Sequence, residues 1–215
     1  DHAELPVMSP GGDRMRQLLH ELRTPVNAIQ GFAEIIQQQL FGTVPHEYRA
    51  QAAAVAGDAA RLLSGFEEVE RLVQLEGGTL AVQAGACDLG QAVAETLERL
   101  VGVLRPREAA ITLAAASDPI PVALDRSELR GLCWRVLASV AAALGQGEQV
   151  VLHLVRNEKH ARLDLHLPAA LQAAANQAPR PAARRPAVTA GMFGPQFTFR
   201  LAAAEARAAG GALEI

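Results

Sequence analysis

Large apolar residues recur with heptad spacing in the first 40 residues of the chain. With a proline counted as one step, successive members lie 4, 3, 4, 3 and 4 residues apart: Leu18, Leu22, Pro25, Ile29, Phe32 and Ile36. This spacing predicts an amphipathic helix over residues 13–40 that packs along an apolar seam. We expect Asp13 to be its N-cap and Pro25 to bend it.

A second stretch repeats the spacing with smaller and larger apolar residues: Val55, Ala59, Leu62, Phe66, Val69 and Val73. It predicts a helix over residues 46–76, joined to the first by residues 41–45. Two such helices would form an antiparallel hairpin, but one hairpin has too little mutual area for a stable core. We therefore expect two hairpins to pair as a homodimeric four-helix bundle.

Beyond residue 80 the helical and strand patterns alternate. They predict helices over residues 88–104, 125–144 and 195–209, and strands over residues 109–113, 148–156, 160–167 and 213–215. Residues 168–190, rich in Ala, Pro and Gln and carrying Arg180, Arg184 and Arg185, are predicted to form a loop. This order favours an α/β sandwich with helices on one face of a mixed sheet.

The fold class is therefore α+β. The predicted organisation is a linker at residues 1–12, a dimerising helical hairpin at residues 13–80 and an α/β domain at residues 81–215.

Composition narrows the partners and the compartment. The 215 residues carry a net charge of −3, so neither nucleic acid nor an anionic membrane is an expected partner. Cys87 and Cys133 lie far apart without a metal-ligand pattern, which favours free thiols in a reducing cytoplasm. The apolar stretch at residues 132–144 contains Arg135 and is too short to cross a bilayer. No signal peptide is visible, and both ends read as cut points, which would place a sensor or membrane region upstream.

Residues 20–25 read His-Glu-Leu-Arg-Thr-Pro and bring an imidazole, a carboxylate and a hydroxyl within about one helical turn. His20 lies off the apolar stripe, so its ring is expected to point to water. An imidazole with an unperturbed pKa near ~6.5 is a competent nucleophile in its neutral form. Thr24 lies one turn further along the same face. From the residues alone, a solvated Glu21, a Thr24 hydroxyl bonded to a helix carbonyl and a plainly exposed Arg23 are open alternatives.

This segment resembles the phosphoacceptor segment (H-box) of two-component sensor histidine kinases, whose core pattern is His-Glu-Leu-Arg/Lys-Thr-Pro. All six positions match, and the resemblance covers roughly residues 13–80. It implies that His20 carries a phosphoryl group and that Glu21 bonds the other ring nitrogen. It further implies that Thr24 orients water for dephosphorylating a partner's aspartyl phosphate, and that Arg23 and Asn27 bind the partner.

In that family the second domain binds ATP, but this chain departs from the family's nucleotide-binding boxes. The two asparagines of the first box fall on Arg135 and Ser139, and the adenine-reading aspartate falls on Leu167. The glycines that follow it fall on Ala169 and Leu171, and of the last glycine-rich box, at residues 194–199, only Gly194 is kept. Backbone amides cradle phosphates only where no side chain blocks the approach, so ATP binding is not expected.

A phosphoacceptor without an ATP site resembles dimeric histidine phosphotransferases of the ChpT type. The resemblance implies an enzyme that moves a phosphoryl group between His20 and aspartates of response-regulator receiver domains. It binds no cofactor itself, and Mg²⁺ is expected on the receiver. One alternative is a sensor histidine kinase fragment that acts in trans or as a receiver phosphatase. Another is a non-catalytic scaffold that binds receivers, although His20 argues against it.

Overall fold

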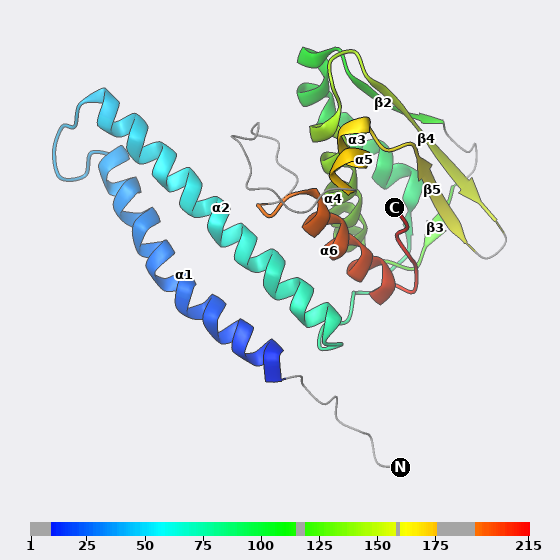
Figure 1. Ribbon diagram of the computed structural model, residues 1–215, viewed down its shortest axis with the longest axis horizontal. Coiled ribbons are helices and arrows are strands. Elements are labelled where there is room, and N and C mark those ends of the chain that lie inside the picture. The colour runs from blue at the N-terminus through cyan, green and yellow to red at the C-terminus, as the bar shows by residue number, and fades with distance from the viewer. Residues whose placement is uncertain (1–9, 115–118, 158–159, 176–191) are drawn as a thin grey trace. The chain divides into compact units, whose positions relative to one another are not determined.

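The computed structural model describes residues 10–114, 119–157, 160–175 and 192–215 (Figure 1). The chain divides into two compact units, the first ending at Leu80 and the second beginning at Ala81. A helical hairpin forms the first unit, and helices with a mixed sheet form the second, as the sequence predicted. Arg180, Arg184 and Arg185 lie outside the described residues.

The first unit is a hairpin of two long helices, α1 (Pro10–Gln37) and α2 (His46–Glu76). The prediction for α2 is confirmed. Helix α1 begins and ends three residues earlier than predicted, so Asp13 lies in its first turn and is not its N-cap. Residues 10–12 of the predicted linker are therefore helical. At the end of α2, Gly77 N donates to Val73 O (2.9 Å) and Gly78 has φ +67°, which closes the helix with a left-handed glycine.

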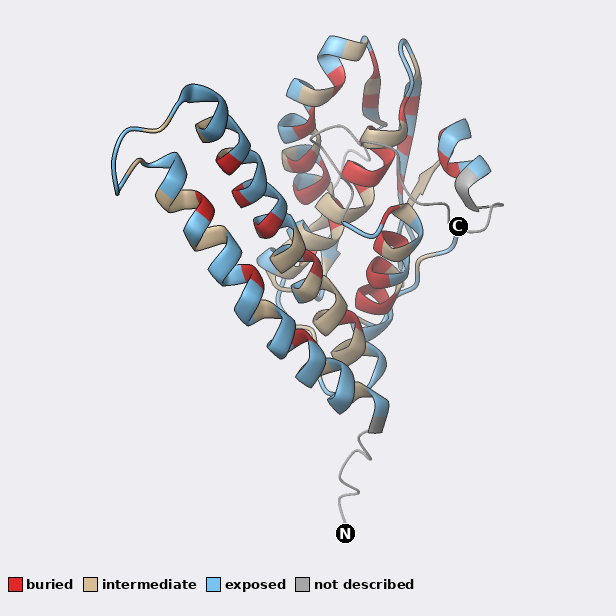
Figure 2. Cartoon of the chain, turned by 60° about the vertical axis from the view of Figure 1, so that its left-hand side comes forward, coloured by how far each residue is buried: buried red, intermediate tan, exposed pale blue. Residues whose placement is uncertain are grey.

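Two stripes run side by side along α1. The inner stripe consists of residues that are buried or half-buried where α1 packs on α2: Leu19, Arg23, Val26, Gln30 and Ala33. The outer stripe consists of the large apolar residues that the spacing singled out: Leu18, Leu22, Ile29, Phe32 and Ile36. Figure 2 shows the buried residues of α1 separated by exposed ones.

The outer stripe is not the seam of the hairpin. Its exposed fractions reach 54% at Leu18 and 68% at Phe32. Small residues of α2, among them Ala52, Ala59 and Gly65, are buried instead and let the two helices approach closely. A stripe of large apolar side chains is thus left uncovered in the single chain.

The second unit begins with well-capped helices. Helix α3 (Leu89–Leu104) follows Asp88, whose carboxylate accepts from Gly90 N (2.7 Å) and Gln91 N (3.3 Å). Helix α4 (Arg126–Ala143) follows Asp125, whose carboxylate accepts from Ser127 N (2.8 Å). A short 3₁₀ turn (Arg105–Arg107) follows α3, and α6 (Pro195–Ala208) is the last helix.

A three-stranded sheet in the order β2-β4-β5 lies behind these helices (Figure 1). Strand β2 (Ala110–Ala114) runs parallel to β4 (Gln149–Arg156), and β5 (Ala161–Leu165) runs antiparallel to it. Alternate residues of β4 are buried, so the helices cover one face of the sheet. The core of the unit includes side chains that are almost wholly inaccessible: Val93, Leu100, Leu137, Val140, Leu152 and Leu201.

Four details of this unit differ from the prediction. A short helix, α5 (Ala169–Ala175), occupies the first part of the predicted loop, and residues 213–215 form no strand. Two short strands, β1 (Cys87–Asp88) and β3 (Pro121–Val122), pair with each other and were not predicted. In the predicted turn at residues 157–159, Asn157 N donates to His160 O (2.9 Å), and residues 158–159 lie outside the described residues.

Two side-chain features of α3 and α4 complete the unit. The Arg99 guanidinium lies 4.3 Å from the ring centroid of Trp134, a cation–π contact between the helices. Both cysteines are free, as predicted. Cys133 is buried, and desolvation raises the pKa of its thiol to about 12, so this thiol is unreactive at neutral pH.

Candidate phosphoacceptor site

The candidate site is an exposed face of α1. His20 is exposed, as predicted from its place off the apolar stripe. Thr24 and Asn27 are also exposed and follow His20 at positions i+4 and i+7, so the three side chains share one face of the helix. This face is opposite in character to the outer stripe, because it carries polar groups that can meet a partner directly.

Glu21 lies beside His20 on the helix and has a partner of its own. Gln17 Nε2 donates to Glu21 Oε1 (3.2 Å), which is an exposed i,i+4 pair. Within the part of the chain that the structure describes, there is no hydrogen bond between the Glu21 carboxylate and the His20 ring. Adjacent helical residues point in different directions, so such a bond requires a change in side-chain rotamer. Gln17 was not predicted, although its position four residues before Glu21 is a readable signal.

The structure does not bring Arg23 to this face. Arg23 belongs to the inner stripe, where its Nη2 lies 3.2 Å from Glu70 Oε2 on α2. Both side chains are about two thirds buried, with exposed fractions of 31% and 32%. Glu70 was missed from sequence, because nothing local links it to a residue 47 positions away.

Pro25 lies inside α1, directly after Thr24. Because proline has no N–H, the Glu21 carbonyl loses its usual helical donor, and the pyrrolidine ring crowds the preceding turn. The turn that carries His20, Glu21 and Thr24 is therefore less well supported by backbone hydrogen bonds than the rest of the helix.

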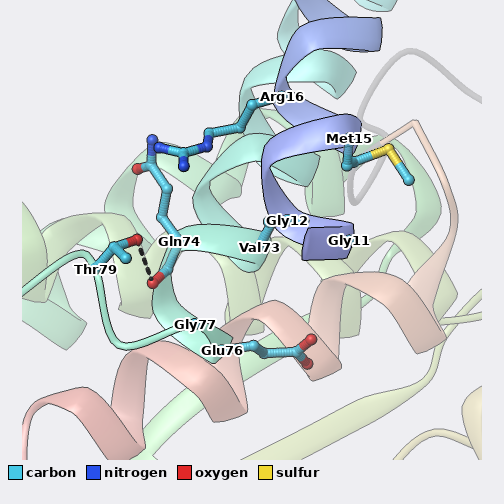
Figure 3. Close-up of a pocket in the computed structure, with 9 residues that line it drawn as sticks. All are labelled: Gly11, Gly12, Met15, Arg16, Val73, Gln74, Glu76, Gly77 and Thr79. Carbon is cyan, nitrogen blue, oxygen red and sulfur yellow. Dashed lines mark hydrogen bonds between the residues drawn. The ribbon is translucent and has the colours of Figure 1, made fainter. Parts of the chain in front are cut away.

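The hairpin also has an open pocket of ≈ 270 Å³, away from these residues. It lies between the first turns of α1 and the end of α2 and is lined by Gly11, Gly12, Met15 and Arg16 together with residues 73–79 (Figure 3). Neither His20 nor Thr24 lines it. The candidate site is thus a convex helix face that suits a protein partner better than a small molecule.

In the second unit, internal contacts occupy the positions that the resemblance assigns to nucleotide binding. Arg135 forms a two-pronged ion pair with Glu205 of α6, with Nε–Oε2 and Nη2–Oε1 distances of 3.1 Å. Exposed fractions of 18% for the Arg135 side chain and 6% for that of Glu205 make this a buried pair. Ser139 is also buried, and its Oγ donates to Arg135 O (2.9 Å).

The last glycine-rich box is likewise absorbed into the fold. Gly194 has φ +88° and precedes α6, and Pro195 occupies the first position of that helix without an N–H to offer. Thr198 Oγ1 donates back to Gly194 O (3.0 Å). Leu171, at the position of a family glycine, is buried in the core. In the described residues there is no group of three or more His, Cys, Asp or Glu side chains that could hold a metal ion.

Comparison with known proteins agrees with the geometry of the hairpin. Residues 13–78 match the His Kinase A (phospho-acceptor) domain. The histidine protein kinase DivJ of Caulobacter vibrioides is 27% identical over 157 residues, which are 71% of this chain and 26% of that protein. The cell-division control histidine kinase PdhS of Brucella anthropi is 24% identical over 143 residues, 64% of this chain and 13% of that protein. The chain thus spans about a quarter or less of these relatives.

Among solved structures, that of full-length ShkA in complex with AMPPNP has a similar fold. The TM-score is 0.60 at 19% identity, over 71% of this chain and 32% of that chain. Residues 13–78 are thus a phospho-acceptor domain of the His Kinase A type. By this domain and its relatives, the chain belongs to the two-component histidine kinase family. No helix among the described residues combines the length and apolar character needed to span a membrane.

Proposed function

We propose that this chain is a histidine phosphotransferase of a two-component phosphorelay, which exchanges a phosphoryl group with receiver domains and does not use ATP. The observation that carries the proposal is the contrast between an intact, exposed His20 face and a second unit whose nucleotide positions hold a buried ion pair. The proposed setting is the cytoplasm, where a phosphorylated receiver supplies both the phosphoryl group and its Mg²⁺.

The transfer step balances without a further reactant. A neutral His20 ring nitrogen attacks the phosphorus of the receiver's aspartyl phosphate, so that an N–P bond forms while the P–O bond to the aspartate breaks. The aspartate leaves as a carboxylate. The other ring nitrogen gives up its proton to solvent, and Glu21 accepts its hydrogen bond before that. Only an exposed hydrogen bond to Gln17 holds Glu21, so the rotamer change needed costs little.

The buried pair in the second unit argues against ATP binding. A guanidinium at the Mg²⁺-binding position and a carboxylate bonded to it leave no free acceptor for the metal. Removing either partner would leave an uncompensated buried charge, so a nucleotide cannot displace the pair cheaply. Leu167, which replaces the adenine-reading carboxylate, offers the base no hydrogen-bond acceptor.

A homodimer is part of this proposal. The outer stripe of α1 is apolar and exposed in the single chain, and a second hairpin would cover it. His20 lies off that stripe, so the dimer would leave the reactive face open to receivers.

A kinase is the second candidate, because DivJ and PdhS are named as histidine kinases and the ShkA structure holds AMPPNP. The decisive experiment offers the protein labelled ATP with Mg²⁺ in one reaction and a labelled phosphoreceiver in another. The proposal expects label on His20 only from the receiver. Label from ATP would favour the kinase.

Two variants refine the test. His20→Gln should accept no label but still dimerise and bind the receiver, because His20 is exposed and supports no core. Thr24→Ala should still accept label, while any receiver dephosphorylation becomes slower, because its hydroxyl can position water but cannot hold the phosphoryl group. If His20→Gln still acquires label, the phosphoacceptor assignment is wrong and a receiver-binding scaffold becomes the better explanation.

A further inference from the structure

The inner stripe of α1 contains a charged residue where an apolar one would be expected. Leu19 and Val26 are buried against α2, and Arg23 lies between them at the same helical face. A polar residue in a helix–helix seam reduces stability but specifies one register, since any sliding or rotation separates it from its partner.

The partner of Arg23 is well defined. Its Nη2 lies 3.2 Å from Glu70 Oε2, and Gln74 Nε2 lies 3.5 Å from the other carboxylate oxygen of Glu70. Glu70 and Gln74 are one turn apart on α2, so Arg23 connects α1 to a short polar row on the facing helix. Both charged side chains are about two thirds buried, which leaves the pair less screened than a surface ion pair.

Arg23 also lies within the turn that Pro25 weakens. The Glu21 carbonyl has no helical N–H donor at position 25, so backbone hydrogen bonding alone holds this turn poorly. His20 and Thr24 are carried by the same turn. A tie from Arg23 to α2 therefore acts where the backbone is least constrained.

We infer that the Arg23–Glu70 pair is a positioning device for the reactive face: it holds the His20–Thr24 turn in one rotation against α2. Arg23 then acts through His20 and does not contact the receiver. This inference rests on the proposed phosphotransfer at His20, and it assigns a role to Glu70, a residue outside the reactive segment.

The first test is Glu70→Gln, which removes the charge and leaves the surface of α1 unchanged. Transfer from a phosphorylated receiver to His20 should become about fivefold slower at saturating receiver, with KM within about twofold of wild type, because the loss concerns orientation and not binding. A purely receiver-binding Arg23 predicts the reverse for its own variants: a higher KM for Arg23→Gln and no effect of Glu70→Gln. That result would overturn the inference.

The exchanged pair Arg23→Glu with Glu70→Arg is the rescue. It restores the tie in reversed polarity, so the rate at saturating receiver should recover most of the loss seen in either single variant. The matched control is Arg61→Gln, which breaks an exposed ion pair with Asp58 on the same helix and should change neither rate nor KM. A rate that stays low in the exchanged pair while that protein folds normally contradicts a positioning role.

A second readout keeps this inference separate from the proposed function. If wild-type protein acquires no label from any phosphorylated receiver, the proposed function fails, but the tie is still measurable by amide hydrogen exchange. The amides of residues 22–24 and 26 should exchange about fivefold faster in Glu70→Gln than in wild type, with Arg61→Gln unchanged. Equal exchange in all three proteins would reject the tie.

Discussion

The two units solve the same problem, what to do with buried and charged groups, in opposite ways. The hairpin leaves its largest apolar side chains exposed, Phe32 at 68% and Leu18 at 54%. The second unit buries Leu100, Leu137 and Leu152 completely and pairs its buried charges internally. The first unit has an unfinished surface, whereas the second is self-contained.

This difference indicates where interaction and chemistry belong. A hairpin with an uncovered apolar stripe and an exposed imidazole is built to meet other protein surfaces. A unit whose nucleotide positions are closed by its own side chains is built to keep its shape without a ligand. Four substitutions can break or sharpen this comparison, beginning with the largest expected effect.

The first prediction concerns the uncovered stripe. Ile29→Asp should raise the dissociation constant of the dimer by about 10²-fold or more, because it would place an unpaired carboxylate in the covered seam. Light scattering across micromolar concentrations measures this. The control is Ala28→Asp, an exposed neighbour off both stripes, which should remain dimeric. A monomeric wild-type protein would reject the four-helix bundle.

The second prediction concerns the buried ion pair. Arg135→Ala should lower the free energy of unfolding of the second unit by about 3–5 kcal/mol, because Glu205 is left charged and buried. Replacing both residues, by Arg135→Met with Glu205→Leu, should recover most of that loss. Urea titration followed by circular dichroism measures both. Arg162→Ala breaks an exposed pair with Asp164 and should change stability by about 0.5 kcal/mol at most.

The third prediction concerns a close backbone contact. A Cβ at Gly85 would lie 2.7 Å from both the Leu124 carbonyl oxygen and the Asp125 Cα. Gly85→Ala should therefore cost about 1–3 kcal/mol of unfolding free energy, since backbone atoms must move. Gly102→Ala, within α3 and with no atom in the way, should instead stabilise by about 0.5–1 kcal/mol. A neutral Gly85→Ala would show that this segment is not held against the start of α4.

The smallest expected effect is a pH dependence at the same helix start. Hydrogen bonds from the Ser127 side chain and backbone hold the pKa of Asp125 below its model value of 3.8. A lowered folded-state pKa gives a stabilisation that is present above the unfolded pKa and lost as pH falls through the folded one. Asp125→Asn keeps a capping side chain but no titration. Its melting temperature should therefore fall less than that of wild type between pH 6 and about pH 3.

Much of the fold follows from local signals. The bounds of α2 and the caps Asp88 and Asp125 were predicted because Pro, Gly and acidic cap residues act within one turn. The two-residue strands β1 and β3 have too few positions to show any alternation, and residues 213–215 alternate without pairing. Pairing partners depend on distant chain segments, which no local pattern identifies.

The seam of the hairpin shows the main limit of hydrophobic spacing. The apolar heptad marked the outer stripe, yet α1 packs on α2 through a stripe that contains Arg23 and Gln30. Long polar side chains bury their aliphatic stems and remain invisible to a hydrophobicity count. The exposed position of His20 was nevertheless predicted, because it is off both stripes. The partners Glu70 and Glu205 required the tertiary structure.

The contact between Arg99 and Trp134 has a spectroscopic consequence. Trp134 is the sole tryptophan of the sequence and lies in the second unit, while Tyr48, the sole tyrosine, lies in the hairpin. Indole emission excited at long wavelength therefore reports on the second unit alone, and phenol emission arises only from the hairpin. One unlabelled sample can thus reveal whether the two units melt together or one after the other.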